Sequence, residues 1–234
     1  MRSLPNLNAD AETITISGTS AGAHYATHLL ILMSDTFKGV GHMKGGAFLA
    51  PYSQMKDQTE WPMEYHIERA VDAIEELNDA EEIDDISNLA ERAAFFVSGS
   101  NDVSVPPHNQ EAARLTLEHF GMTMTDSITR ADGHGWHKDN AWLTIEHLYT
   151  SLGYVEAIET SEWWFDAETV GSFYPWSQHE FYPEDHDWEL TNFKNRDNGY
   201  IYVPAQCETQ QCKLHFVLHG WGGSPNKGNQ AFFN

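Results

Sequence analysis

A serine lies between two glycines in residues 18–22, which read Gly-Thr-Ser-Ala-Gly. Residues 13–17 before it have the β-branched composition of a strand, and residues 23–33 after it are rich in Ala and Leu, as in a helix. Gly-x-Ser-x-Gly between a strand and a helix is the nucleophile elbow, a tight turn that exposes the serine. We therefore expect Ser20 to be a nucleophile, with the Ala21 amide beside it at the helix N-terminus.

A nucleophilic serine needs a base, and the base needs an acid that orients it. Asp102 follows the apolar residues 93–98, and His134 lies in a His/Gly-rich loop after the next expected strand. The order serine, acid, histidine is that of α/β-hydrolases. The sequence therefore predicts a catalytic triad of Ser20, Asp102 and His134.

Each member of this triad has a simpler alternative. The glycines around the serine are also compatible with a loop that only caps a helix. Asp102 could cap the helix expected near Pro106, and His134 could be one of 13 histidines in an exposed loop. His137 is the second candidate for the base, and Asp132 is a weaker candidate for the acid.

A second His/Gly loop, residues 219–222, follows an apolar strand at 213–218. It resembles the His-Gly loop that donates a backbone N–H to the oxyanion in α/β-hydrolases, so we expect the Trp221 amide to join that of Ala21 in an oxyanion hole. In the usual chain order this loop precedes the serine, whereas here it follows it. The sequence thus predicts a circularly permuted fold or a chain that straddles two tandem copies, unless the loop is a plain turn.

The rest of the chain alternates strands and helices, which predicts an α/β fold with a mostly parallel sheet and helices on both faces. Functional loops then gather at the carboxyl ends of the strands. We expect one domain over residues 1–234, with an irregular aromatic-rich segment at 155–198. Further strands are expected near 39–48, 122–129 and 199–204, and helices near 63–92, 107–120 and 139–152.

Composition narrows the possible functions. The 234 residues include 13 Lys and Arg against 35 Asp and Glu, a net charge of −22 that makes a nucleic-acid partner a poor expectation. The mean hydropathy is −0.50 and no apolar run is long enough for a membrane helix, so we expect no membrane insertion. The many acids between Glu64 and Glu91 are typical of a solvated helical face.

The sequence favours chemistry without a metal or an organic cofactor. The two cysteines, Cys207 and Cys212, can close a small disulfide loop, but two sulfurs alone make a poor metal site. His24 and His28 are spaced for one face of a helix, yet no third ligand accompanies them. The clustered aromatics of residues 155–190 fit a lid or core, or else a surface that adsorbs a solid.

Several of these motifs occur in order along most of the chain: residues 17–22, 34–37, 99–102, 133–134 and 199–220. Together they resemble the extracellular polyhydroxybutyrate (PHB) depolymerases of the fungal, circularly permuted type. The resemblance implies a secreted serine esterase that cleaves poly(3-hydroxybutyrate), related polyesters or short-chain esters through an acyl-enzyme. It implies the roles given above for the triad and the two amides, and it matches Cys207 and Cys212 to a cysteine pair of that family.

Two departures from the family pattern stand out. The family has Cys where this chain has Trp221, although a backbone donor survives that change. Family members also continue through a helix, a strand and a closing helix after the His-Gly loop, so we expect a domain that is incomplete after residue 234. We expect a monomer without a secretory signal at Met1; the alternatives are a feruloyl-type carboxylesterase and a non-catalytic, surface-binding relative.

Overall fold

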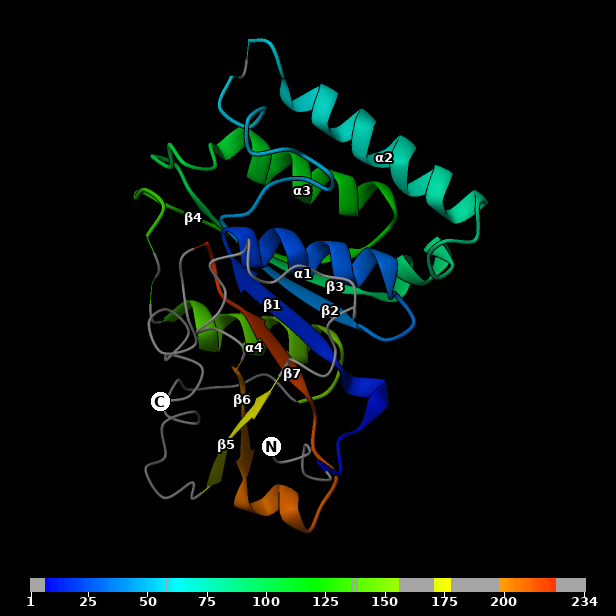
Figure 1. Cartoon of the computed structure of the whole chain (residues 1–234), viewed down its shortest axis with the longest axis vertical. Coiled ribbons are helices and arrows are strands. Elements are labelled where there is room, and N and C mark those ends of the chain that lie inside the picture. The colour runs from blue at the N-terminus through cyan, green and yellow to red at the C-terminus, as the bar shows by residue number, and fades with distance from the viewer. Residues whose placement is uncertain are drawn as a thin grey trace.

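The main sheet of the protein is entirely parallel in the residues that the computed structural model describes, which are 7–57, 59–135, 137, 139–155, 171–177 and 198–221. Its five strands have the order β4-β3-β2-β1-β7 (Figure 1). Their bounds are Thr15–Thr19 (β1), Gly39–Met43 (β2), Ala93–Gly99 (β3), Thr123–Arg130 (β4) and His215–Leu218 (β7). The predicted parallel sheet is confirmed.

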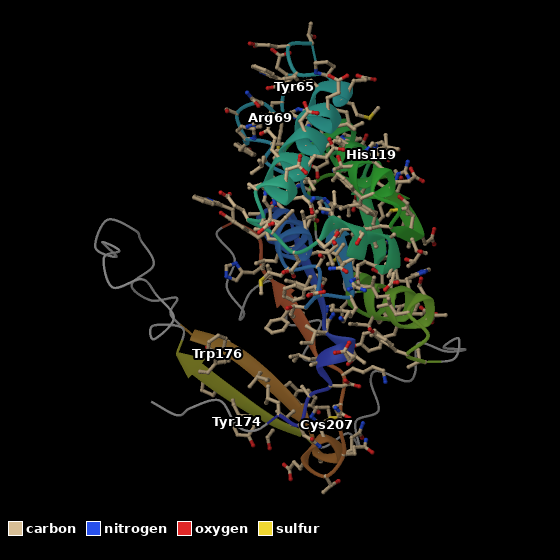
Figure 2. The ribbon with its side chains drawn as sticks, turned by 90° about the vertical axis from the view of Figure 1, so that its right-hand side faces the viewer. Tyr65, Arg69, His119, Tyr174, Trp176 and Cys207 are labelled. Carbon is tan, nitrogen blue, oxygen red and sulfur yellow. A yellow bond between two sulfur atoms is a disulfide. The ribbon has the colours of Figure 1, made fainter. Side chains whose placement is uncertain are left out.

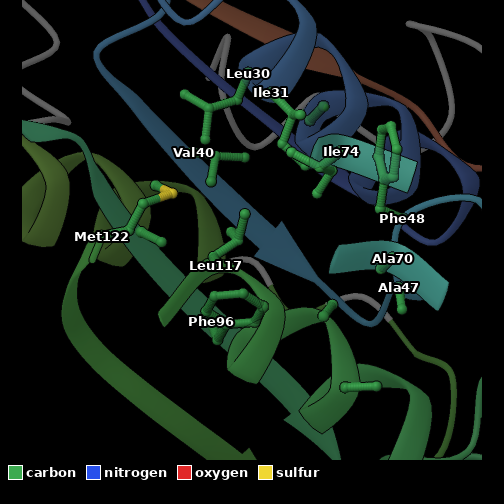
Figure 3. Packing of buried hydrophobic residues seen from close by; sticks show 14 of the residues in the cluster. Leu30, Ile31, Val40, Ala47, Phe48, Ala70, Ile74, Phe96, Leu117 and Met122 are labelled. Atoms are coloured by element: carbon green, nitrogen blue, oxygen red, sulfur yellow. The ribbon is translucent and has the colours of Figure 1, made fainter. Parts of the chain in front are cut away.

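Helices cover both faces of this sheet, because its strands are apolar on both sides. On β3, Ala94 and Phe96 pack with the helices of one face, whereas Phe95 and Val97 pack with the single helix of the other. The first face carries α1 (Ala21–Leu32), α2 (Met63–Asp79) and α3 (Pro107–His119), and the second carries α4 (Asp139–Ser151). Figure 3 shows side chains from all three helices of the first face in one cluster with Phe96 of β3 and Val40 of β2.

Helix α2 is shorter than the acidic pattern predicted. It ends at Asp79, and the expected helical stretch to residue 92 contains a turn followed by a short 3-10 helix at Ile86–Glu91. Glu81 has a positive φ of 57°, and the Glu82 amide donates to the carbonyl of Leu77, which closes the helix end. The turn returns the chain to β3, a tertiary requirement that periodicity does not reveal.

A second, two-stranded antiparallel sheet pairs β5 (Gly171–Ser177) with β6 (Asn198–Pro204). Residues 171–177 therefore form a strand within the segment that we expected to be irregular. Residues 156–170 and 178–197 of that segment fall outside the described residues. Figure 2 shows Tyr174 and Trp176 on this hairpin, well apart from α2 with Tyr65 and Arg69.

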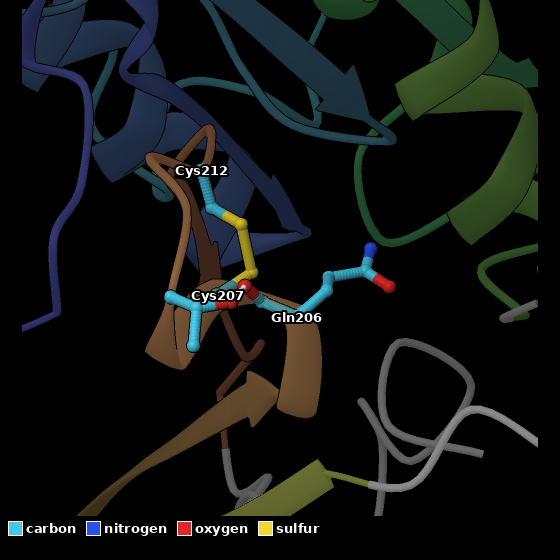
Figure 4. Close-up of a disulfide and its surroundings, with 4 residues drawn as sticks. Gln206, Cys207 and Cys212 are labelled. Atoms are coloured by element: carbon cyan, nitrogen blue, oxygen red, sulfur yellow. Dashed lines mark hydrogen bonds between the residues drawn. A yellow bond between two sulfur atoms is a disulfide. The ribbon is translucent and has the colours of Figure 1, made fainter.

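A disulfide follows the hairpin and confirms the expected cysteine pair. Cys207, in the 3-10 helix Ala205–Glu208, is bonded to Cys212, with Cα atoms 5.6 Å apart (Figure 4). The Asp10 amide donates to the carbonyl of Cys212, so the N-terminal residues contact the loop that the disulfide closes. This loop leads directly into β7.

Strand β7 is the last described strand in the chain, yet it lies beside the first. The ring nitrogens of His215 on β7 bind the hydroxyls of Thr15 and Ser17 on β1, both at 2.8 Å. Desolvation of this ring lowers its pKa to about 3, so the imidazole is neutral in the folded protein. The pairing brings residues 219–221 to the same edge of the sheet as Ser20, as a permuted chain order requires; the permutation itself stays a prediction.

Candidate active site

Ser20 occupies the sharp turn between β1 and α1. Its backbone has φ 57° and ψ −122°, a conformation that is strained for a residue with a side chain. The Ser20 amide donates to the carbonyl of Met43 at 2.9 Å, and its carbonyl accepts from the amide of His24. The strained turn is thus held by the end of β2 on one side and the first turn of α1 on the other.

The two glycines around this serine are required by close backbone contacts. A Cβ on Gly18 would lie 2.2 Å from the carbonyl carbon of Gly22. A Cβ on Gly22 would lie 2.3 Å from the carbonyl oxygen of Leu218, at the end of β7. The absence of a side chain at Gly18 allows the tight turn, and its absence at Gly22 allows the end of β7 to approach α1.

His134 links Ser20 to Asp102 by hydrogen bonds through both ring nitrogens. Its Nε2 lies 2.7 Å from the Ser20 Oγ, and its Nδ1 lies 2.6 Å from Oδ2 of Asp102. The histidine side chain is 26% exposed, whereas the aspartate side chain is fully buried. Three segments that are far apart in the sequence thus form one hydrogen-bonded series with an opening to solvent.

The buried carboxylate of Asp102 is compensated on every side. Its Oδ1 accepts from the amides of Ser104 and Val105, each at 2.9 Å, and its Oδ2 accepts from Nε2 of Gln110 as well as from the histidine. Asp102 does not cap α3, the alternative explanation, because the N-cap of that helix is Pro106 and no side chain caps it; the two amides that Asp102 binds lie in the turn before the helix. Gln110 was not singled out in the sequence, where nothing distinguishes it from other helical glutamines.

The alternative base and acid bind each other instead of Ser20. Nε2 of His137 contacts Oδ2 of Asp132, and Oδ1 of the same aspartate accepts from Nζ of Lys44 at 2.9 Å. Lys44 was missed by the sequence reasoning. The signal that could have revealed it is its position as the lone charged residue in the apolar and glycine-rich stretch 39–50.

The two expected oxyanion donors lie on segments that border the serine. Ala21 is the first residue of α1, where amides have no acceptor within the helix. Trp221 follows Gly220, at which a Cβ would lie 3.1 Å from the Cβ of Ser20. Trp221 is 90% exposed, so its indole lies in solvent. The donor expected for the oxyanion is its backbone amide.

His24 and His28 pack against each other on α1, with ring centroids 4.4 Å apart. The Nδ1 of His28 donates to the carbonyl of His24, and its Nε2 accepts from the amide of Leu49. Burial lowers the pKa of both rings, to about 3 for His24. Since backbone groups use both nitrogens of His28, neither is available to a metal.

Comparison with known proteins shows which family the chain belongs to. Residues 5–158, well over half of the chain, match the prolyl oligopeptidase family. The chain belongs to this family. Two further relatives extend the similarity to 93% of the chain: a poly(3-hydroxybutyrate) depolymerase of Delftia acidovorans at 26% identity and a polyhydroxybutyrate depolymerase of Talaromyces funiculosus at 23%. This member of the family spans 47% of the first relative and 67% of the second.

Solved structures agree with the predicted fold. The PHB depolymerase of Penicillium funiculosum superimposes with a TM-score of 0.72 at 21% identity, covering the whole chain and 76% of that protein. A serine-to-alanine variant of a PHB depolymerase, complexed with an R3HB trimer, gives 0.73 at 20% identity and the same coverage. The resemblance to PHB depolymerases and the α/β-hydrolase-like fold are thereby confirmed.

Proposed function

We propose that this protein is a serine hydrolase that cleaves carboxylic esters, with poly(3-hydroxybutyrate) or a related polyester as its substrate. The observation that carries the proposal is the hydrogen-bonded series from Ser20 through His134 to Asp102. The names of its relatives supply the substrate class, since two are PHB depolymerases and one related structure holds an R3HB trimer.

In the proposed reaction, the Ser20 Oγ attacks the ester carbonyl while Nε2 of His134 takes its proton. The Asp102 carboxylate keeps the other ring proton on Nδ1 and stabilises the imidazolium without accepting that proton. The amides of Ala21 and Trp221 donate to the negatively charged oxygen of the tetrahedral intermediate. The alcohol leaves with the proton from His134, and water then hydrolyses the acyl-serine in the same way, releasing the acid.

We also propose that the protein acts outside the cell as a monomer. The disulfide between Cys207 and Cys212 supports an oxidising compartment. In the described part of the chain, no helix has the length and apolar character needed to cross a membrane. Gel filtration with light scattering should give a mass of 26.5 kDa. A mass of twice that value or a higher multiple would contradict the monomer.

Replacement of the nucleophile tests the reaction. Ser20→Ala should lower kcat for p-nitrophenyl butyrate by at least about a thousandfold, because the proposed acyl-enzyme forms on the Ser20 hydroxyl. Ser151→Ala, which changes an exposed serine at the end of α4, is the matched control and should retain full activity. Turnover in Ser20→Ala equal to that of the wild type would overturn the proposal.

A second measurement separates the substrate classes. Release of soluble acid from a poly(3-hydroxybutyrate) film should accompany turnover of the soluble ester in the wild type and disappear in Ser20→Ala. Activity on soluble esters alone would indicate a small-molecule carboxylesterase. Adsorption to the film without release, and without labelling of Ser20 by a fluorophosphonate, would indicate a non-catalytic binding protein.

A further inference from the structure

Lys44 is a charged side chain in the protein interior. It follows β2 directly, has a positive φ of 54°, and its amide donates to the carbonyl of Val97. Its side chain is only 1% exposed. Because removal of an ammonium group from water is costly, such a lysine is retained only where its protons are fully bound.

The partners of this ammonium all belong to the loop that carries His134. Nζ donates to Oδ1 of Asp132 at 2.9 Å, to the carbonyl of Gly133 at 2.8 Å and to the carbonyl of Gly135 at 2.7 Å. An ammonium has three protons, so these contacts use all of them. The carbonyls of the residues immediately before and after the histidine are therefore bound by a single atom.

Little packs against the two glycines that flank the histidine, although the carbonyl of Asp132 before them accepts from the amide of Asn101. A Cβ on Gly135 would have no atom within 4 Å, and one on Gly133 would meet only the carbonyl oxygen of Asn101, at 3.6 Å. Glycines on both sides of a histidine give its backbone much conformational freedom. The hydrogen bonds from Lys44 thus restrain the backbone on both sides of His134, in addition to the contacts that its ring makes with Asp102 and Ser20.

The end of β2 also contacts the nucleophile. The carbonyl of Met43 accepts from the amide of Ser20, and the next residue, Lys44, binds the carbonyls of both residues that flank His134. One strand end therefore sets the position of the serine and of the histidine ring relative to each other.

We propose that Lys44 is a positioning residue that holds His134 against Ser20, an inference that rests on the proposed esterase function. A different explanation is that Lys44 only balances the charge of Asp132, whose second oxygen is bound by His137. The two explanations differ in whether the carbonyl contacts at residues 133 and 135 matter.

Lys44→Met should lower kcat for p-nitrophenyl butyrate by about 10- to 100-fold with little change in KM, because a small displacement of the base slows chemistry more than binding. Lys38→Met is the matched control. Lys38 immediately precedes β2, is 14% exposed, and likewise binds a carbonyl, that of Asp35, and a carboxylate, that of Glu12. Its replacement should leave kcat within about twofold of the wild type.

The double variant Lys44→Met/Asp132→Asn separates positioning from charge balance, because it removes the carboxylate together with the ammonium that balances it. Positioning predicts a folded protein whose kcat stays as low as in Lys44→Met. Recovery of wild-type kcat in the double variant would overturn the proposal, and so would wild-type kcat in a folded Lys44→Met variant.

A spectroscopic measurement tests the contact without relying on turnover. The Nδ1 proton of His134, hydrogen-bonded to Asp102, should give a low-field proton NMR signal in the wild type and in Lys38→Met, and this signal should be weakened or shifted in the double variant. An unchanged signal there would overturn the role of Lys44. Absence of any Ser20-dependent hydrolysis would instead overturn the proposed function, and the NMR result would still decide the role of Lys44.

Discussion

The two carboxylate oxygens of Asp102 have different partners. Oδ1 binds two backbone amides and stabilises the turn before α3, whereas Oδ2 binds the His134 ring. A change that preserves shape but removes charge should therefore affect the histidine more than the fold.

Asp102→Asn should lower kcat by about 10³- to 10⁴-fold, because an amide nitrogen facing Nδ1 favours the wrong tautomer of the base. Thermal unfolding monitored alongside the assay should show that the variant remains folded. Asp85→Asn is the control: Asp85 also accepts from a backbone amide, that of Ser87, but contacts no histidine, so its replacement should leave kcat unchanged. Equal activities of the two variants would contradict the role of Asp102.

At the scale of elements, the site depends on how closely β1, α1 and β7 approach one another. Gly22 lies in the first turn of α1 against the carbonyls of Leu218 and His219. On an exposed helix, replacement of glycine by alanine is stabilising by about 1 kcal/mol. Here the added methyl group would overlap the backbone of the neighbouring strand.

Gly22→Ala should therefore lower the free energy of unfolding by about 1–3 kcal/mol, the opposite sign to its effect on an isolated helix. The added methyl group should also push residues 219–221 away from Ser20 and so lower kcat. Chemical denaturation with a parallel ester assay measures both effects. Unchanged or increased stability would show that β7 and α1 do not approach as closely as described.

At the scale of the whole molecule, several histidines are held neutral by their surroundings. Desolvation is the main cause that lowers the pKa of His42 to about 4 and those of His24 and His215 to about 3. In the unfolded chain each would have a pKa near 6.5. Between these values the unfolded state binds protons that the folded state does not, so stability falls as the pH falls.

Unfolding by guanidinium at pH 7.5, 5.5 and 4.5 should therefore show little change above pH 6.5 and a steep loss below it. Each such histidine contributes about 1.4 kcal/mol per pH unit in the region between its unfolded and folded pKa. His215→Gln should reduce the number of protons taken up on unfolding by about one, so the free energy of unfolding should fall less steeply with decreasing pH. A free energy of unfolding that does not change from pH 7.5 to 4.5 would contradict the neutral, desolvated state of these rings.

Much of the fold was predictable because its signals are local. The apolar run at 93–98 predicted a strand buried on both faces, and the Gly-x-Ser-x-Gly turn predicted the sharp connection from β1 to α1. The end of α2 was not predictable, because an acidic helical pattern continues past Asp79 while the chain must turn back toward the sheet.

By itself, the amino-acid sequence determined which residue types follow each strand, and so which serine, acids and histidines reach one edge of a parallel sheet. Only the tertiary structure shows that His134 rather than His137 contacts Ser20, and that Asp102 rather than Asp132 contacts His134, because the direction of a side chain in a loop depends on contacts with distant segments. The buried ammonium of Lys44 is the clearest case: its partners lie some 90 residues away, where no local pattern extends.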